Sequence, residues 1–260
     1  MPMSAIDVSG LVKRYRGAAH NAVDEISFQV ESGQFFCLLG PNGAGKTTTV
    51  SILTTVLEQT SGEVRVAGRD VSTDQGGVRR EIGVVFQQPA LDQNLTAEEN
   101  LRLHVMLYGL YRWRPLYRWM PASYRTQVQE TAGVLGMEDA LGRPVRTLSG
   151  GQRRRLEIVR ALMHQPRVLF LDEPSAGLDP QSRRSLWSHL SQARAEFGTT
   201  ILLTTHYLEE AETADAACVL SRGRIVDRGS PAELMQRHGG QSLEDAYLTL
   251  LGQDEQCHQD

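Results

Sequence analysis

The sequence predicts an α/β fold built around a parallel sheet, and three observations carry this prediction. Short apolar runs of strand length alternate with helical stretches, which is typical of a parallel sheet. A glycine-rich loop lies between one fully apolar run and a helical stretch. A mostly helical segment, from about residue 96 to residue 136, interrupts the alternation and indicates an inserted subdomain. The 260 residues are enough for one to two domains.

The composition is that of an ordinary globular protein. Hydrophobic residues make up 40% of the chain and charged residues 22%, and the net charge is −4. This mild acidity argues against a general nucleic-acid binder, since such domains are usually basic. No stretch approaches the roughly 20 apolar residues of a membrane-spanning helix. Residues 1–5 lack the features of a secretory signal. The three widely spaced cysteines, Cys37, Cys218 and Cys257, are expected to be free thiols in a reducing compartment.

Strand patterns separated by turns make up the N-terminal third. Apolar and polar residues alternate over residues 26–30, as in a half-buried strand. A turn then leads to residues 35–39, which are all apolar and predict a fully buried strand. Further strands are expected around residues 64–66 and at residues 82–86, on either side of a turn signal.

Strands and helices alternate in the second half. One helix is predicted directly after the serine and glycines at residues 149–151. Two more helices are expected at residues 181–195 and 207–214. The strands between and after them are expected at residues 168–171, 200–204, 217–220 and 225–227.

The glycine-rich loop carries the first chemical motif. It fits the pattern G-x-x-x-x-G-K-[ST], and its residues are Gly40, Pro41, Asn42, Gly43, Ala44, Gly45, Lys46 and Thr47. Glycines let the backbone N–H groups face phosphate oxygens, and the following helix points its N-terminus at the same anion. Lys46 is placed to reach the β- and γ-phosphates, and Thr47 to ligate Mg²⁺. The loop therefore predicts binding of a nucleoside triphosphate.

Two carboxylates end the buried strand at residues 168–171. Ligands of parallel sheets bind at the carboxyl ends of the strands, so Asp172 and Glu173 are expected beside the glycine-rich loop. Asp172 is then placed to hold Mg²⁺, and Glu173 to orient or deprotonate a water molecule. Attack on a γ-phosphate needs such positioning more than covalent help. Taken alone, the glycine-rich loop is also compatible with GTPases, kinases and helicases.

Leu148-Ser149-Gly150-Gly151-Gln152 precedes the acidic pair and matches the signature pentapeptide of the ATP-binding cassette (ABC) family. With the phosphate loop and the acidic strand end, the chain resembles the ATPase subunit of an ABC transporter from about residue 6 to residue 229. The resemblance implies a P-loop NTPase fold with a RecA-like parallel-sheet core and an N-terminal antiparallel β subdomain. It also implies an ATPase domain over residues 1–235, with a helical subdomain inserted at about residues 90–160. A helical tail with a disordered end is expected at residues 236–260.

The resemblance assigns roles to further residues at matching positions. Tyr15 matches the aromatic residue that stacks on adenine, and Thr48 joins the nucleotide-binding set. Gln87 matches the glutamine that senses Mg²⁺ and the catalytic water, although the adjacent Gln88 leaves the register open by one residue. His206 matches the switch histidine that contacts the γ-phosphate. The residues matched to the half-site facing an opposite subunit are Ser149, Gly150, Gly151, Gln152 and Asp179.

The resemblance implies an ATP- and Mg²⁺-dependent motor that closes as a dimer of two copies and works with a separate membrane-spanning permease. Its expected place is the cytoplasmic face of the membrane, with no nucleic-acid partner. Residues 175–184 and 243–248 are similar to the exporter branch that includes daunorubicin-type resistance ATPases. An importer ATPase and a soluble non-transport ABC protein remain the alternatives. The single P-loop and the lack of sustained heptads disfavour the soluble one.

Residues 108–124 depart from this branch, where the connection is shorter. They include two of the three tryptophans of the chain, four tyrosines and three arginines, and no Asp or Glu. Three interpretations stay open. The aromatic side chains pack on their own subdomain, dock the membrane subunit or lipid headgroups, or contact nucleic acid.

Overall fold

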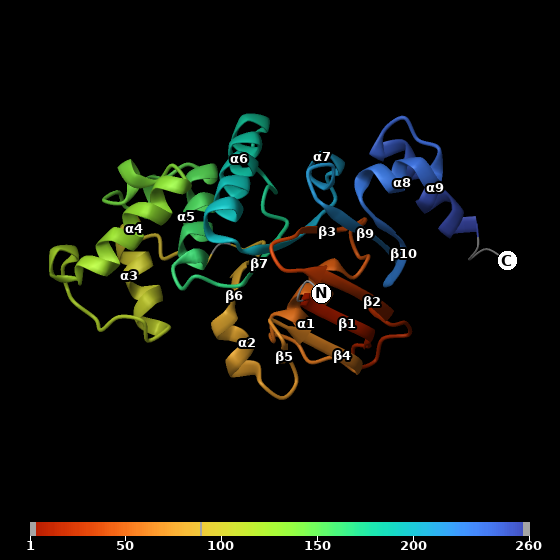
Figure 1. Cartoon of the computed structure of the whole chain (residues 1–260), viewed down its shortest axis with the longest axis horizontal. Helices are drawn as coiled ribbons and strands as arrows, with labels where there is room; N and C mark the ends of the chain where they lie inside the picture. Colours follow the sequence, from red (N-terminus) through yellow and green to blue (C-terminus); the bar gives the residue numbers. More distant parts are fainter. Residues whose placement is uncertain (1–3, 89, 257–260) are drawn as a thin grey trace. The chain divides into compact units, whose positions relative to one another are not determined.

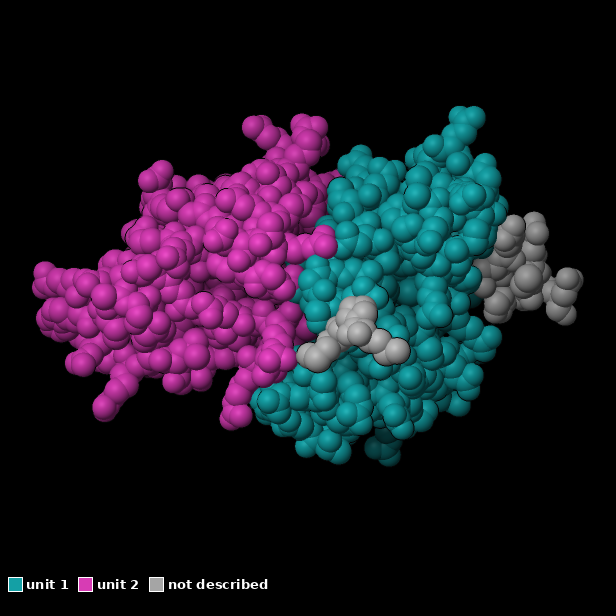
Figure 2. Space-filling model, in the orientation of Figure 1, with its two compact units in different colours: residues 1–79, 170–173, 200–260 teal, residues 80–169, 174–199 magenta. Residues whose placement is uncertain are grey.

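The structure is a computed structural model that describes residues 4–88 and 90–256, with side chains through residue 252. The expectations for residues 1–3, for Cys257 and for the end of the tail lie outside this range. The chain forms two compact units (Figure 2). Unit 1 comprises Met1–Arg79, Phe170–Glu173 and Thr200–Asp260, and unit 2 comprises Arg80–Leu169 and Pro174–Thr199.

Unit 1 begins with an antiparallel sheet of four strands in the order β2-β1-β4-β5 (Figure 1). These are β1 (Ser4–Lys13), β2 (Val23–Glu31), β4 (Ser61–Val66) and β5 (Arg69–Asp70). The alternation predicted for residues 26–30 is confirmed, because Ile26, Phe28 and Val30 are buried and the residues between them are exposed. The Phe28 ring stacks on Phe36 of the next strand at 5.4 Å.

The second sheet of unit 1 has a parallel core. Its strands follow the order β10-β9-β3-β8-β7, with residues 170–172 of β7 in this unit. The strands are β3 (Phe35–Leu39), β8 (Thr200–Thr205), β9 (Ala216–Ser221), β10 (Arg224–Gly229) and β7 (Val168–Asp172). β3 runs parallel to both β8 and β9, and β10 is antiparallel to β9. The predicted α/β class is confirmed, and Leu39 and Thr205 lie in register at the carboxyl ends of their strands.

The helices of unit 1 flank these sheets, and α2 crosses into unit 2. They are α1 (Lys46–Leu53), α2 (Gln75–Glu81), α7 (Leu208–Ala211), α8 (Pro231–His238) and α9 (Leu243–Gln256). The helix expected at residues 207–214 is wrong in length. The amides of Thr213 and Ala214 bond three residues back instead of four, so the chain tightens into turns before β9. Cys37 and Cys218 are free, as predicted. Both are also buried, and burial raises the pKa of both thiols.

Unit 2 is largely helical and begins with β6 (Ile82–Val85), which pairs with the start of β7. Its helices are α3 (Ala97–Leu107), α4 (Ala122–Val134), α5 (Gly150–Leu162) and α6 (Pro180–Phe197), with short 3₁₀ turns at Tyr117–Trp119, Glu138–Ala140 and Val145–Thr147. The segment expected to be mostly helical therefore splits into α3 and α4. Gly109 adopts a left-handed φ of 70°, and Pro115 and Pro121 follow, so a continuous helix cannot form.

Within residues 4–88 and 90–256, no helix is long and apolar enough to cross a membrane.

Candidate active site

The glycine-rich loop joins β3 to α1 in unit 1 and leaves the start of α1 open. Gly45 caps the helix with a left-handed φ of 102°, no side chain caps the first amides, and no acidic residue lies in the first turn. A Cβ atom at Gly45 would lie 2.5 Å from the carbonyl oxygen of Ala22, so glycine is required there. The uncapped N–H groups and the helix dipole therefore form an anion-binding end.

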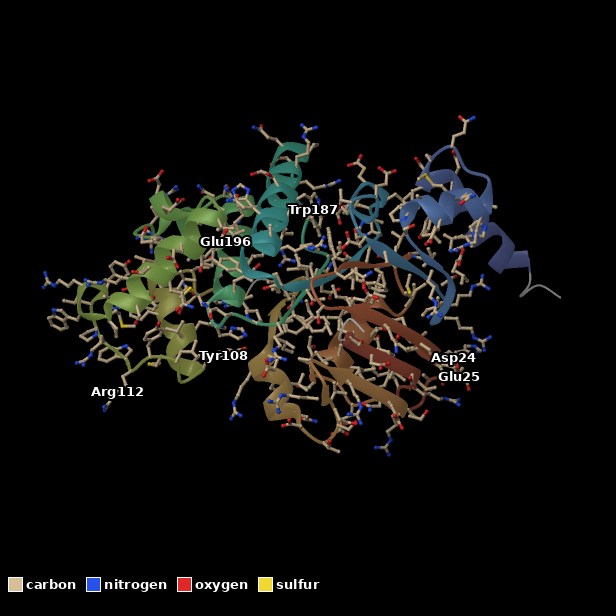
Figure 3. The ribbon with its side chains drawn as sticks, viewed as in Figure 1. Asp24, Glu25, Tyr108, Arg112, Trp187 and Glu196 are labelled. Atoms are coloured by element: carbon tan, nitrogen blue, oxygen red, sulfur yellow. The ribbon has the colours of Figure 1, made fainter. Side chains whose placement is uncertain are left out.

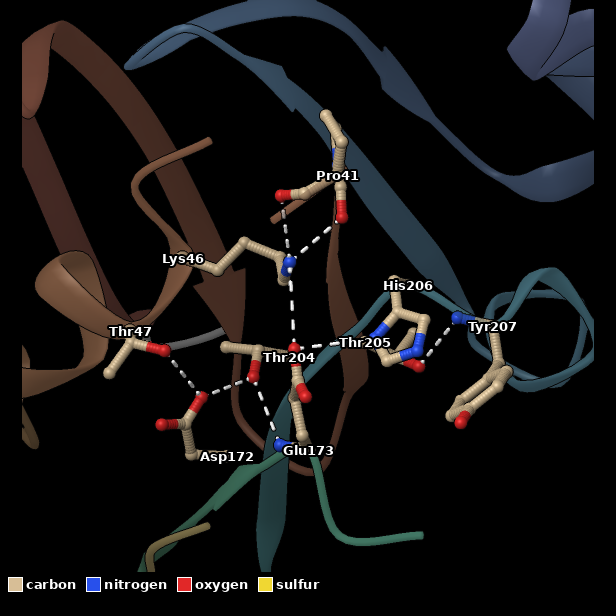
Figure 4. A network of polar contacts seen from close by, with 10 residues as sticks. Pro41, Lys46, Thr47, Asp172, Glu173, Thr204, Thr205, His206 and Tyr207 are labelled. Atoms are coloured by element: carbon tan, nitrogen blue, oxygen red, sulfur yellow. Dashed lines mark hydrogen bonds and ion pairs between the residues drawn. The ribbon is translucent and has the colours of Figure 1, made fainter. Parts of the chain in front are cut away.

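Lys46 lies inside this loop, and its side chain is almost fully buried. Its Nζ donates to the carbonyl oxygens of Gly40 at 2.8 Å and Pro41 at 3.1 Å, and it lies 3.7 Å from Oε1 of Glu173 (Figure 4). Burial lowers the pKa of Lys46, and the carboxylates of Glu173 and Asp172 oppose this shift. The positive charge is thus held at the loop, where an anion would meet it.

Three oxygen-bearing side chains converge at the end of β7. The Thr47 hydroxyl donates to Oδ1 of Asp172 at 3.2 Å, and the Thr204 hydroxyl donates to the same oxygen at 2.5 Å. Asp172 is buried. Hydroxyl and carboxylate oxygens are the ligands that Mg²⁺ prefers, so the donor set of Thr47 and Asp172 fits this ion.

Glu173 connects the lysine to the histidine. Its Oε1 lies 3.3 Å from Nδ1 of His206, beyond the end of β8, and 3.7 Å from the Lys46 ammonium (Figure 4). Its backbone has a φ of 45°, which is uncommon for a residue with a side chain. The Glu173 N–H donates to both the hydroxyl and the carbonyl of Thr204 at 3.1 Å, which holds this conformation. Such backbone strain occurs preferentially at functional sites.

Thr204 was missed by the sequence analysis, although it contacts both acidic residues. The signal was its place in β8, the strand that directly precedes His206. Threonine is common in β-strands because of its strand propensity alone, so the presence of a threonine there does not indicate a functional site.

Tyr15 lies in the loop after β1 and is 45% exposed. Its hydroxyl is 3.3 Å from the Thr48 hydroxyl in α1, and the Lys13 ammonium lies 5.5 Å from its ring centre. The structure therefore brings these two predicted nucleotide-binding residues together and leaves the ring open to a planar partner.

The remaining predicted residues belong to unit 2. Ser149 and Gln152 form a capping box at the start of α5, in which each side chain accepts from the other residue's N–H. A Cβ atom at Gly151 would lie 3.1 Å from Oγ of Ser182, so the helix start passes close to α6. Ser182 Oγ also donates to Asp179 at 2.6 Å, and this bond lowers the pKa of the Asp179 carboxyl.

Asp179 and the pentapeptide thus share one contact residue, Ser182, to which the sequence analysis gave no role. Gln87 and Gln88 are both exposed after β6, and the match of Gln87 to the family's glutamine stays a prediction.

The parallel sheet, the phosphate loop and the acidic strand end are the features of a P-loop nucleoside triphosphatase. Comparison with known proteins agrees: the family model described as ABC transporter matches residues 23–176. The chain is 42% identical over 243 residues to the daunorubicin/doxorubicin resistance ATP-binding protein of Streptomyces peucetius, covering 93% of this chain and 70% of that protein. It is 40% identical to the Nod factor export ATP-binding protein I of Ralstonia nicotianae, covering 93% and 72%.

A solved structure agrees as well. A dimeric ATP-binding cassette in a post-hydrolysis state, bound to ADP and Pi, matches with a TM-score of 0.74 and 26% identity over 86% of this chain and 98% of that one. The chain belongs to the ABC transporter family, and within this family it is an ATPase subunit.

Proposed function

We propose that this chain is the ATP-hydrolysing motor of an exporter that moves a drug, a lipid or another small molecule. Its similarity to proteins named for daunorubicin resistance and for Nod factor export supports the export direction. The observation that carries the catalytic part of the proposal is the network in which Glu173 contacts both Lys46 and His206.

The proposed roles follow this network. Lys46 exchanges the carbonyl oxygens of its own loop for the β- and γ-phosphates and releases Glu173. Glu173 then orients or deprotonates the attacking water, while His206 contacts the γ-phosphate. Positioning and charge stabilisation supply most of the catalysis in phosphoryl transfer, and these groups provide both. Tyr15 stacks on adenine with its exposed ring.

The proposed Mg²⁺ site uses Thr47 and Asp172 of unit 1. The role in Mg²⁺ binding that the resemblance implies for Gln87 stays a prediction. When bound, Mg²⁺ would neutralise the negative charge of the β- and γ-phosphates. Thr204 orients Asp172 through the bond that it donates to Oδ1. The carboxylate therefore needs little rearrangement to accept a cation.

We further propose that two copies form the working unit. In this arrangement, the phosphate loop of one copy and the pentapeptide and Asp179 of the other copy enclose one ATP. The helix start at Ser149 is a second anion-binding end, which suits the γ-phosphate. The dimeric cassette among the similar structures supports this assembly. ATP binding closes the pair and hydrolysis opens it, as in other switches driven by a γ-phosphate.

The export proposal includes a separate membrane-spanning permease, which this chain contacts at the cytoplasmic face of the membrane through the loop that follows Gln87. We assign residues 1–235 to the ATPase domain, with the helical subdomain at about residues 90–160, and residues 236–260 to a C-terminal tail.

Direction of transport is tested with membrane vesicles from cells that express the chain with its membrane subunit, using daunorubicin as the probe. Export predicts ATP-dependent accumulation in inverted vesicles and its loss in the Glu173→Gln variant. Accumulation that depends on ATP only in right-side-out vesicles would indicate an importer instead.

A further inference from the structure

The loop between α3 and α4, residues 108–121, gathers exposed apolar side chains. We call it the Arg–Trp loop. Ten large hydrophobic side chains are exposed among the described residues, and seven of them lie in or just before this loop. The seven are Leu103, Leu107, Tyr108, Leu110, Trp113, Leu116 and Trp119. Trp113 is 60% exposed and Trp119 55%, so neither ring belongs to the core of unit 2. This concentration on one short segment points to a binding surface.

Contacts among three tyrosines fix the loop to the rest of unit 2. Tyr124 is fully buried at the start of α4 and donates to Glu98 at 3.0 Å. The rings of Tyr111 and Tyr117 meet the Tyr124 ring edge-on, at 5.4 and 6.1 Å between centres. Arg102 of α3 donates to the carbonyl oxygen of Arg114 at 3.0 Å. The tyrosines therefore anchor the loop, and the tryptophans are left for another partner.

The charge of this region is one-sided. Residues 103–129 contain four arginines and no Asp or Glu, in a chain whose net charge is −4. Arg102, just before them, is buried and ion-paired with Glu98. Arg112, Arg114 and Arg118 are exposed, and Arg112 extends away from the ribbon (Figure 3). The Arg118 guanidinium lies 5.8 Å from the Trp119 ring centre, which pairs a positive charge with an amphipathic ring.

We propose that the Arg–Trp loop binds directly to the surface of a membrane that contains anionic phospholipid. Tryptophan rings lie at the level of lipid headgroups, exposed leucines reach the acyl boundary, and arginine binds phosphate with two hydrogen bonds. The loop then attaches the ATPase to the membrane independently of ATP and of any permease. This property goes beyond the motor function proposed above.

Charge decides between lipid and a membrane protein as the partner of the loop. Cytoplasmic loops of membrane proteins carry an excess of Lys and Arg, so they repel a surface with arginines and no acidic residue. Anionic headgroups give the cytoplasmic leaflet a negative potential, which attracts such a surface. Nucleic acid is the less suitable anion, because four of the seven exposed apolar side chains are leucines, which offer no stacking surface to bases.

The test is flotation of the purified full chain, without nucleotide, with vesicles of two compositions. One contains phosphatidylcholine alone, and the other contains equal parts of phosphatidylcholine and phosphatidylglycerol. The loop variants are Arg112→Gln/Arg114→Gln/Arg118→Gln and Trp113→Ala/Trp119→Ala. The matched control, Arg65→Gln/Arg80→Gln/Arg146→Gln, removes the same charge from exposed arginines elsewhere.

The wild-type chain should float with the anionic vesicles and not with the neutral ones, and high salt should weaken this binding. Each arginine near an anionic surface contributes about fivefold, so the loop triple variant should bind on the order of 100-fold more weakly. The double tryptophan variant should lose about tenfold. The control variant should bind at most a fewfold more weakly than the wild type, through the general loss of charge.

Both loop variants should keep the wild-type melting temperature, because their side chains are exposed. Equal binding to both vesicle types, or loop variants that bind as well as the control, would overturn the proposal. So would loop variants that float normally but fail to bind a permease or an oligonucleotide. None of these outcomes depends on ATP hydrolysis, so they are distinct from a failure of the motor function.

Discussion

Thr204 is the residue on which both acidic side chains of the site depend. Its hydroxyl donates to Asp172 and accepts from the N–H of Glu173, whose backbone has a positive φ. One side chain therefore orients the proposed Mg²⁺ ligand and holds the conformation of the proposed catalytic carboxylate.

Thr204→Val should lower both stability and turnover. The valine keeps the shape but leaves a buried Asp172 oxygen with one donor fewer, at a cost of about 1–3 kcal/mol in the free energy of unfolding. ATP hydrolysis should fall by at least about tenfold, since Glu173 also loses a contact. Thr204→Ser, which keeps the hydroxyl, should retain most activity. The measurements are chemical denaturation and steady-state ATP turnover, and a Val variant as active as the Ser variant would contradict this role.

At the scale of secondary-structure elements, the pentapeptide forms the N-terminus of helix α5. Ser149 and Gln152 close a capping box on α5, and Ser230 and Glu233 close the same kind of box on α8. Capping boxes of the same kind thus begin both helices, and Thr96 and Glu99 form a third on α3, but of these three helices only α5 carries a motif of the family. A comparison of α5 with α8 therefore separates the contribution of a capping residue to stability from a contribution to ATP hydrolysis.

Ser149→Ala and Ser230→Ala should each reduce the free energy of unfolding by about 1 kcal/mol, because each removes a cap. Turnover of ATP should fall strongly in the Ser149 variant alone, since only that helix start is proposed to face a γ-phosphate. Melting temperature and ATPase rate, measured on both variants, provide the comparison. Equal ATPase rates in the two variants would leave Ser149 with no more than a capping role.

The elements also show what the sequence can predict. The strands and the phosphate loop can be predicted from the sequence, because the alternation of apolar and polar residues and the spacing of glycines are local properties. The aromatic segment was not resolved, since composition does not tell which face a ring takes. Tyr124 is buried while Trp113 and Trp119 are exposed. This partition depends on the tertiary contact with Glu98 and on Gly109 and Pro121, which separate α3 from α4. The role of Thr204 could not be predicted either, because its partners Asp172 and Glu173 are distant in sequence.

At the scale of the whole molecule, each copy is proposed to carry two incomplete halves of a site. Unit 1 has the phosphate loop and the acidic pair, and unit 2 has the pentapeptide and Asp179. In this proposal, the half in unit 1 hydrolyses ATP quickly only when the half in unit 2 of the other copy completes it. This division predicts complementation between defective copies.

Lys46→Ala and Gly151→Asp should each be nearly inactive alone, the first through its phosphate loop and the second through its helix start. Mixing them in equal amounts should restore about a quarter of the wild-type ATPase rate, since half of the dimers are mixed and each has one intact site. The rate of the mixture is compared with the mean of the two variants. A mixture no faster than that mean would argue against shared sites.

The central claim is that Glu173 serves the chemical step and not ATP binding. The most direct measurement is ATP affinity and single-turnover hydrolysis on the same preparation of Glu173→Gln. The amide keeps the shape of the carboxylate and loses its basicity, so affinity should stay within a fewfold of wild type. Hydrolysis should fall by about 10²-fold or more, and the variant should elute as a dimer in ATP. Hydrolysis at the wild-type rate would contradict the account.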